Sequence, residues 1–289
     1  FGGGTDFPNW YQKNGCNIVS SSIDAFCYIS IRKLLPFYGN NYRISWSEIE
    51  VVNSIKKIKH PAIKGALDYL NIKELYPPQK ESMQSIERNE SLLMSVPTAA
   101  GKTVVAYNAL MKAVQEGKKG IFLVPLRALA WEKVNELRDI CKNILNGAKI
   151  GVSVGDFDKI RGLSKYDIIV ATSERADSLI RHNPPWLTEV GCLVSDEIHL
   201  INDSTRGPTL EVTLSKFREI NPDIQIIGLS ATVSNSKQVA DWLEATLVES
   251  DFRPVPLKKG ICIANEIEWD GDEFKKIDID GTEGIALDN

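Results

Sequence analysis

The residues with the clearest chemical potential form the run Pro97, Thr98, Ala99, Ala100, Gly101, Lys102 and Thr103. It follows the apolar stretch from Leu92 to Val96, which is typical of a buried strand, and precedes a segment with helical periodicity. A strand that ends in a tight turn points successive backbone N–H groups into one hollow, and the next helix adds the positive end of its dipole. The run therefore predicts a polyphosphate site. Lys102 would reach the β- and γ-phosphates, and the Thr103 hydroxyl would bind Mg²⁺.

The run departs from the full pattern G-x-x-x-x-G-K-[ST], because Val96 stands at the position of the first glycine. Taken alone, it could also be an ordinary strand-to-helix turn with an incidental Gly-Lys-Thr. A second cluster of polar residues is needed to choose between these interpretations.

Two carboxylates supply that cluster. Asp196 and Glu197 directly follow the short apolar run from Cys192 to Ser195, which is typical of a buried strand. Ligands of open parallel sheets collect at the carboxyl ends of the strands. Asp196 is suited to hold Mg²⁺, usually through water, and Glu197 to orient or deprotonate an attacking water. The pair alone could be a solvated acidic loop, but together with the predicted phosphate loop it favours a site of the ATPase type.

These residues resemble a known family, the DExH helicases of superfamily two. Asp196-Glu197-Ile198-His199 is similar to the DExH box, and residues 97–103 are similar to motif I, which often lacks the first glycine. The other motifs follow in order: Leu75–Gln79 resembles the adenine-reading Q motif, Pro125–Leu129 motif Ia, Ala171–Asp177 motif Ib, and Ser230–Thr232 motif III.

Three further stretches narrow the resemblance to the Ski-like branch, and within it to the archaeal Hjm-type DNA helicases, relatives of the helicase part of DNA polymerase theta. They are Glu197–Asp203, Arg206–Glu211 and Asp251–Leu257. The resemblance covers about residues 60–265. It implies an ATP-dependent DNA helicase that moves 3′ to 5′ on single-stranded or forked DNA, in repair or replication-fork processing. An RNA helicase of the same superfamily, and a nucleotide- and strand-binding module without useful turnover, remain as alternatives.

The same resemblance implies the roles of individual residues. Glu197, Lys102 and Asp196 would be catalytic, Gln79 and residues 97–103 would bind ATP, and Thr103 and Asp196 would hold Mg²⁺. His199 would couple the ATP site to the strand through hydrogen bonds with Ser230 and Thr232. The residues expected to contact DNA are Pro125, Arg127, Ala128, Thr172, Ser173, Arg175 and Arg206.

The charge balance bears on the nucleic-acid partner. A net charge of −4 argues weakly against DNA binding, but a motor needs a local cationic track rather than a basic whole. Arg127 and Arg175 lie inside motif-like segments and are expected to contact phosphates, whereas Lys133, Arg161 and Arg181 are expected to be solvated surface charges. The tryptophans Trp131, Trp186 and Trp242 are expected to pack in the core or between helices rather than to stack on bases.

The elements that must position these residues alternate between short apolar runs and amphipathic helical patterns. This alternation predicts an α/β fold of the RecA-like P-loop type, a mostly parallel sheet with helices on both faces. The predicted strands are Leu92–Val96, Ile121–Val124, Ile150–Val154, Ile168–Ala171, Leu193–Ser195 and Ile226–Leu229. The predicted helices are Ile55–Tyr69, Thr103–Val114, Leu126–Cys141, Glu174–Arg181, Leu210–Glu219 and Ser236–Glu244.

We divide the sequence into three parts: an N-terminal extension of uncertain structure at 1–50, a RecA-like ATP-binding domain at 51–254, and a linker or β-hairpin at 255–289 with a turn at Asp270-Gly271. Nothing after this resembles a second RecA-like domain with its arginine finger, so we expect the first motor domain of a longer helicase that needs the second domain in cis. The chain begins with Phe1 and its first methionine is Met83, which predicts either a fragment or non-ATG initiation at Val51 or Val52.

Composition fits one large α/β core, with 43% hydrophobic residues. No apolar run is long enough to cross a bilayer, and no secretory signal is evident. The five cysteines lack Cys-x-x-Cys spacing, which indicates free thiols in a reducing compartment. We therefore expect a cytoplasmic monomer that uses ATP and Mg²⁺, acts on DNA and has no membrane partner.

Overall fold

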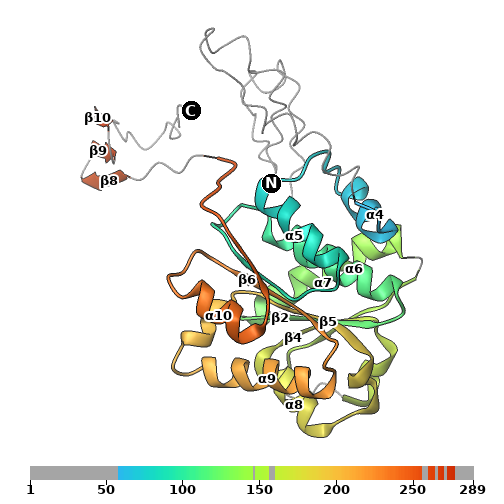
Figure 1. Ribbon diagram of the computed structural model, residues 1–289. Coiled ribbons are helices and arrows are strands. Elements are labelled where there is room, and N and C mark those ends of the chain that lie inside the picture. The colour runs from blue at the N-terminus through green and yellow to red at the C-terminus, as the bar shows by residue number, and fades with distance from the viewer. Residues whose placement is uncertain are drawn as a thin grey trace, which may run out of the picture.

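The computed structural model describes residues 58–145, 147–155 and 160–255, together with strands at 260–263, 266–269 and 272–276. Its centre is a seven-stranded sheet between two layers of helices (Figure 1). The N-terminal extension at 1–50, the predicted initiation region at Val51 and Val52, and the Asp270-Gly271 turn lie outside the described residues.

The seven strands of the sheet are all parallel, which confirms the predicted RecA-like α/β architecture. Their order is β3-β4-β2-β5-β6-β1-β7. The bounds are β1 (Leu92–Ser95), β2 (Lys119–Val124), β3 (Ile150–Ser153), β4 (Ile168–Thr172), β5 (Val190–Ser195), β6 (Gln225–Ser230) and β7 (Thr246–Glu249). The edge strand β7 was not predicted, because only Val248 of its four residues is buried and the strand carries little apolar signal.

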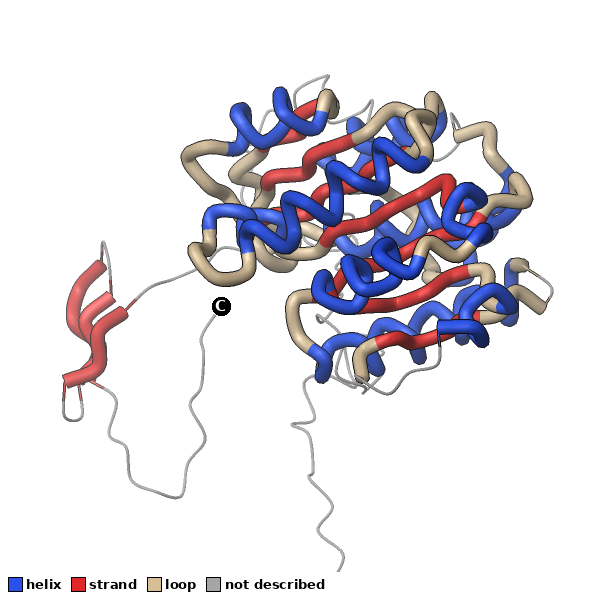
Figure 2. The backbone as a smooth tube through the Cα atoms, turned by 90° about the horizontal axis from the view of Figure 1, so that it is seen from below, coloured by secondary structure: helices blue, strands red, loops and turns tan. Residues whose placement is uncertain are grey.

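Helices cover both faces of the sheet. One layer holds α4 (Pro61–Tyr69), α5 (Pro77–Glu87), α6 (Lys102–Gln115) and α7 (Arg127–Ile144), and the other holds α8 (Ser173–His182), α9 (Gly207–Ile220) and α10 (Ser236–Leu243). Figure 2, seen from below, shows helices of the second layer in front of the strands. Short 3₁₀ helices lie at Ile160–Lys165, Pro185–Glu189 and Ile198–Asn202. None of the described helices is long and apolar enough to span a membrane.

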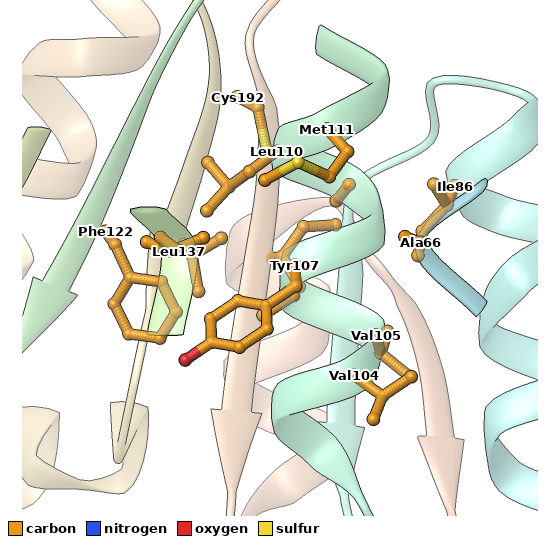
Figure 3. Packing of buried hydrophobic residues seen from close by; sticks show 14 of the residues in the cluster. Ala66, Ile86, Val104, Val105, Tyr107, Leu110, Met111, Phe122, Leu137 and Cys192 are labelled. Atoms are coloured by element: carbon orange, nitrogen blue, oxygen red, sulfur yellow. The ribbon is translucent and has the colours of Figure 1, made fainter. Parts of the chain in front are cut away.

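The core is divided by the sheet into two clusters, because successive side chains of a strand point to opposite faces. Met94 and Phe122 belong to the cluster under α6 and α7, and their neighbours Leu93 and Ile121 belong to the cluster under α8 and α9. Figure 3 shows the first cluster, in which α6 side chains meet Phe122 of β2. Burial on both faces explains the continuous apolar runs of the strands.

Helix α4 begins later than predicted. The predicted helix started at Ile55, whereas α4 starts at Pro61 and residues 58–60 are not helical. Proline fixes its own φ for a first helical turn and disfavours helical backbone in the residue before it, and His60 is extended with φ −70° and ψ 125°.

Beyond the main sheet, β8 (Gly260–Ile263), β9 (Glu266–Trp269) and β10 (Asp272–Lys276) form a three-stranded antiparallel sheet. Trp269 of β9 pairs with Asp272 of β10.

Candidate functional site

The predicted nucleotide-binding segments follow three neighbouring strands and lie together at the carboxyl ends of those strands. Ser195 of β5 pairs with Gly228 of β6, and Ser230 of β6 pairs with Ser95 of β1. The carboxylate pair follows β5, the Ser230–Thr232 segment ends β6, and the phosphate loop follows β1. Because the strands are parallel, all three segments meet at the carboxyl edge, where ligands of such sheets bind.

The predicted phosphate loop joins β1 to α6 through two residues with left-handed backbone. Ala99 has φ +69° and Gly101 has φ +76°. The positive φ favours glycine at position 101, and a Cβ atom there would lie 2.1 Å from Nε2 of Gln79, so that amide would have to move. Left-handed residues alternating with ordinary ones are a feature of backbone nests that bind anions, and the loop leads directly into the N-terminus of a 14-residue helix.

Lys102 lies across this loop. Its Nζ donates hydrogen bonds to the carbonyl oxygens of Val96 at 3.0 Å and Pro97 at 3.3 Å. The loop thereby holds the Lys102 ammonium group next to its own backbone N–H donors. A polyphosphate could bind to the ammonium group and to these N–H groups at the same time. Thr98 and Ala99 are exposed at the tip of the loop, while Thr103 is half-buried in the first turn of α6.

Gln79 connects the start of α5 to the loop. The Tyr76 backbone N–H donates to its Oε1 at 3.0 Å, and its Nε2 donates to the Gly101 carbonyl at 3.1 Å. The residue is 2% exposed, and the predicted adenine contact stays a prediction. The Tyr76 ring packs on Phe252, with centroids 5.1 Å apart. Phe252 was not among the predicted site residues, although it lies in the Asp251–Leu257 stretch that narrowed the resemblance.

The carboxylate pair lies in a sharp turn after β5. The Asp196 backbone N–H donates to the Leu123 carbonyl at 3.0 Å, and the Glu197 N–H donates to Oδ1 of Asp196 at 3.0 Å. The backbone of Glu197 is in the left-handed region, with φ +49°. Burial and the charge of Glu197 raise the pKa of Asp196, while Lys133 and Lys102 oppose the shift. A half-buried carboxylate of this kind is suited to a divalent cation, so the side chains of Asp196 and Thr103 have the chemistry to hold Mg²⁺.

The three residues predicted to couple hydrolysis to strand binding are brought together only in part. Nδ1 of His199 lies 3.3 Å from Oε2 of Glu197 and 3.5 Å from Oγ of Ser230. The Ser230 hydroxyl donates to the Ala231 carbonyl at 2.7 Å. Thr232 is exposed, and within the described chain no hydrogen bond joins it to His199.

Most of the residues predicted to contact DNA lie over the neighbouring strands β2 and β4, where Val124 pairs with Thr172. They surround a hollow of about 400 Å³, which we call the strand hollow, lined by Pro125, Leu126, Arg127, Thr172, Glu174, Arg175 and Ser178. Arg127 is exposed at its rim, and Arg175 is 8% exposed in its wall.

The other predicted DNA contacts do not line the strand hollow. Ala128 and Ser173 adjoin lining residues in sequence, and Arg206 lies at the start of α9, 3.7 Å from Asp203. Leu126, Glu174 and Ser178 were missed. The i, i+4 spacing of Glu174 and Ser178, which places them on one face of α8, was an available signal.

Two predictions about side chains of α7, those of Lys133 and Trp131, are wrong. The Lys133 side chain is 13% exposed and is not a solvated surface charge, whereas Trp131 is 52% exposed and does not pack in the core. The buried stripe of α7 contains Ala130, Val134 and Leu137, and position 131 lies beside that stripe.

The remaining expectations of the same kind have mixed outcomes. Trp186 is buried, and Trp242 packs partly buried against the second cluster, as predicted. Arg181 is an exposed charge paired with Asp177, and the side chain of Arg161 lies outside the described residues. Cys141 and Cys192 are buried free thiols, and burial raises the pKa of each to about 12.

The sequence of this chain is similar to those of known helicases. A family described as "DEAD/DEAH box helicase" matches residues 76–240, more than half of the chain. The chain is 48% identical over 202 residues to "ATP-dependent DNA helicase Hel308" of Thermoplasma acidophilum, covering 68% of this chain and 29% of the relative. It is 46% identical over 215 residues to the protein of that name from Methanococcus vannielii, covering 72% and 28%.

The fold of this chain is also similar to solved structures of helicases. The structure described as "DUF1998 helicase MrfA bound to DNA and AMPPNP" superposes with a TM-score of 0.59 at 26% identity, covering 68% of this chain and 30% of that one. The structure of MrfA described without DNA gives 0.57 at 25% identity. The chain spans less than a third of the length of the two Hel308 relatives.

Proposed function

Because the chain belongs to the DEAD/DEAH box helicase family, we propose that it is the nucleotide-binding motor domain of an ATP-dependent DNA helicase. The observation that carries the proposal is the register of the sheet. The ends of β1, β6 and β5 gather the phosphate loop, Ser230 and the carboxylates, and the ends of β2 and β4 gather the strand hollow. The names of the Hel308 relatives support DNA as the polynucleotide.

In this proposal the phosphate loop and Lys102 bind the triphosphate. Lys102 exchanges its bonds to the Val96 and Pro97 carbonyls for phosphate oxygens, and the Thr103 hydroxyl and Asp196 hold Mg²⁺. When bound, Mg²⁺ offsets the negative charge of the phosphates. Glu197 orients the attacking water and accepts its proton, while Gln79 contacts the adenine.

The strand contacts in this proposal are made to the backbone of DNA. Arg127 and Arg175 pair with phosphates, and the Thr172 and Ser173 hydroxyls can bond to phosphate oxygens. Pro125 and Ala128 let the strand approach the start of α7, and Arg206 adds a cationic group at the start of α9. Contacts of this kind fix the register of the strand without reading its sequence.

Efficient turnover, in this proposal, requires a second RecA-like domain in cis. That domain would close on the exposed tip of the phosphate loop at Thr98 and Ala99 and bring an arginine to the γ-phosphate, which is worth roughly three to five orders of magnitude in rate. Closure on ATP and release after hydrolysis would give the 3′ to 5′ movement that the resemblance implies, with one protein chain as the acting unit.

The test compares single-stranded DNA and RNA of the same base sequence. Fluorescence anisotropy measures the affinity of this chain for each labelled oligomer, with and without ATP and Mg²⁺. We expect tighter binding of DNA, and binding of ATP that depends on Mg²⁺. Tighter binding of RNA would instead identify an RNA helicase, and failure to bind ATP would contradict the proposed function.

A further inference from the structure

A polar bridge joins the two helices that begin at the two halves of the proposed site. Helix α6 begins at Lys102 of the phosphate loop, and α7 begins at Arg127 of the strand hollow. The Tyr107 hydroxyl of α6 donates a hydrogen bond to Oε2 of Glu136 in α7. Nζ of Lys133, one turn earlier in α7, lies 3.4 Å from the same oxygen. Tyr107, Lys133 and Glu136 therefore form one bridge, which we call the α6–α7 bridge.

The α6–α7 bridge is largely removed from water. Tyr107 is 4% exposed, and the side chains of Lys133 and Glu136 are 13% and 12% exposed. Figure 3 shows the Tyr107 ring beside Phe122 and Leu137, with its hydroxyl pointing away from α6. A shielded carboxylate is costly unless it is paired, so Glu136 depends on the Lys133 ammonium and the Tyr107 hydroxyl for its stability.

Only one oxygen of Glu136 is held. Oε1 is buried and has no hydrogen-bond partner in the described part of the chain, whereas Oε2 receives both other members of the bridge. Burial and the charge of Glu136 raise the pKa of Tyr107 well above its ordinary value, so the tyrosine stays a hydrogen-bond donor at neutral pH. A carboxylate held at one oxygen can change its pairing when α7 moves.

The bridge also lies within electrostatic range of the carboxylate pair. The charge of Asp196 raises the pKa of Tyr107, and the charge of Lys133 acts on Asp196. The charge of Lys133 therefore acts on two carboxylates, Glu136 on its own helix and Asp196 after β5. A shift of α7 changes how this one cation is shared between them.

We propose that Lys133 and Glu136 are positioning residues that couple strand binding at Arg127 to nucleotide binding at the phosphate loop. The inference rests on the proposed function. Helix α7 is continuous over 18 residues, so a displacement of its first turn by a bound phosphate also displaces Lys133 and Glu136. Tyr107 passes the displacement to α6, whose first residue is Lys102. Coupling between two binding sites is reciprocal, so nucleotide must tighten or weaken strand binding by the same factor.

The experiment measures that factor directly. The affinity of the chain for ATP with Mg²⁺ is determined by calorimetry with and without a saturating single-stranded oligothymidylate, and the ratio of the two affinities is the coupling factor. A factor of about 5 to 150 is typical of coupled sites, and we expect the unmodified chain to fall in this range. Lys133→Met and Glu136→Gln are expected to reduce the factor several-fold, and Glu136→Gln is expected to leave ATP affinity without DNA near that of the unmodified chain.

Two further variants separate coupling from a merely structural role. Tyr107→Phe keeps the buried ring and removes only the hydroxyl, and its effect on the coupling factor should not fully add to that of Glu136→Gln, since the first removes and the second weakens the same Tyr107–Glu136 hydrogen bond. Glu132→Gln is the matched control, because Glu132 adjoins Lys133 at 3.8 Å but its side chain is 46% exposed. It should leave the factor unchanged. A structural role would lower the melting temperature and leave the ratio intact.

The outcomes that overturn the inference are distinct from those that overturn the proposed function. A chain that binds both ligands with a coupling factor of one, or with a factor that Lys133→Met and Glu136→Gln leave unchanged, contradicts the inference alone. A chain that binds no ATP contradicts the proposed function and the inference with it.

Discussion

Nδ1 of His199 lies 3.3 Å from Oε2 of Glu197, so the histidine contacts the carboxylate that we propose to orient the attacking water. The same nitrogen lies 3.5 Å from Oγ of Ser230, at the end of the strand between the two halves of the nucleotide site. Any change at Ser230 therefore has a short path to Glu197 through one imidazole nitrogen.

His199→Ala should retain ATP affinity but lose part of the stimulation of hydrolysis by DNA, because it removes the connection between Glu197 and Ser230 and leaves the phosphate loop intact. The loss should be several-fold, on the scale of a coupling of roughly 1–3 kcal/mol. Single-turnover hydrolysis with and without oligothymidylate, with the second RecA-like domain present in cis, measures it. Equal stimulation in the variant and the unmodified chain would leave His199 without a coupling role.

Arg127→Ala and Arg175→Ala should weaken binding of single-stranded DNA about equally across base sequences, since phosphate contacts carry no base preference. Each lost contact should flatten the log–log dependence of affinity on salt by about 0.7. Arg181→Ala is the control, because Arg181 lies in the same helix as Arg175 but pairs with Asp177 and is 67% exposed. Anisotropy at several salt concentrations gives the slopes, and slopes that match the control would leave both arginines without a phosphate contact.

Gly101→Ala should lower both the free energy of unfolding, by roughly 1–3 kcal/mol, and the affinity for ATP, because it adds left-handed strain and forces Gln79 away from the loop. Gly117→Ala isolates the strain, since Gly117 has φ +78° and an added Cβ there would meet no other group within 4 Å. Urea unfolding and ATP calorimetry are measured on both. Loss of ATP affinity in both variants alike would mean that the Gln79 contact does not shape the loop.

Trp186→Ala should cost about 3–5 kcal/mol of unfolding free energy, because it leaves a cavity in the second cluster. Trp131→Ala should stay within about 0.5 kcal/mol of the unmodified chain, because half of that side chain is already in water. Urea unfolding of the two variants compares them. A Trp131 variant as unstable as the Trp186 variant would contradict the exposure of Trp131.

The sequence predicted the elements better than the directions of individual side chains. Apolar runs located β1 to β6 within a few residues, since burial on both faces leaves a strong signal, whereas the edge strand β7 left almost none. The predicted nucleotide residues lie together because the ends of three neighbouring strands position them. Lys133 and Trp131 were misjudged because their burial depends on which side of α7 faces α6, and single-sequence periodicity does not resolve neighbouring positions on a helix. The hydrogen bonds of Gln79 to the Tyr76 backbone N–H and the Gly101 carbonyl also depend on the conformation of the folded loop, which the sequence pattern does not give.

The central claim, a nucleotide site divided between a binding loop and a hydrolytic carboxylate, is tested most directly by ATP affinity in two variants. Lys102→Ala removes a phosphate-binding cation and should weaken ATP binding by at least about tenfold, or 1.4 kcal/mol. Glu197→Gln keeps the size and polarity of the side chain and should retain ATP affinity while losing hydrolysis in a single turnover. Calorimetry with ATP and Mg²⁺ gives both affinities. Equal losses of affinity in the two variants, or no loss in Lys102→Ala, would contradict the account.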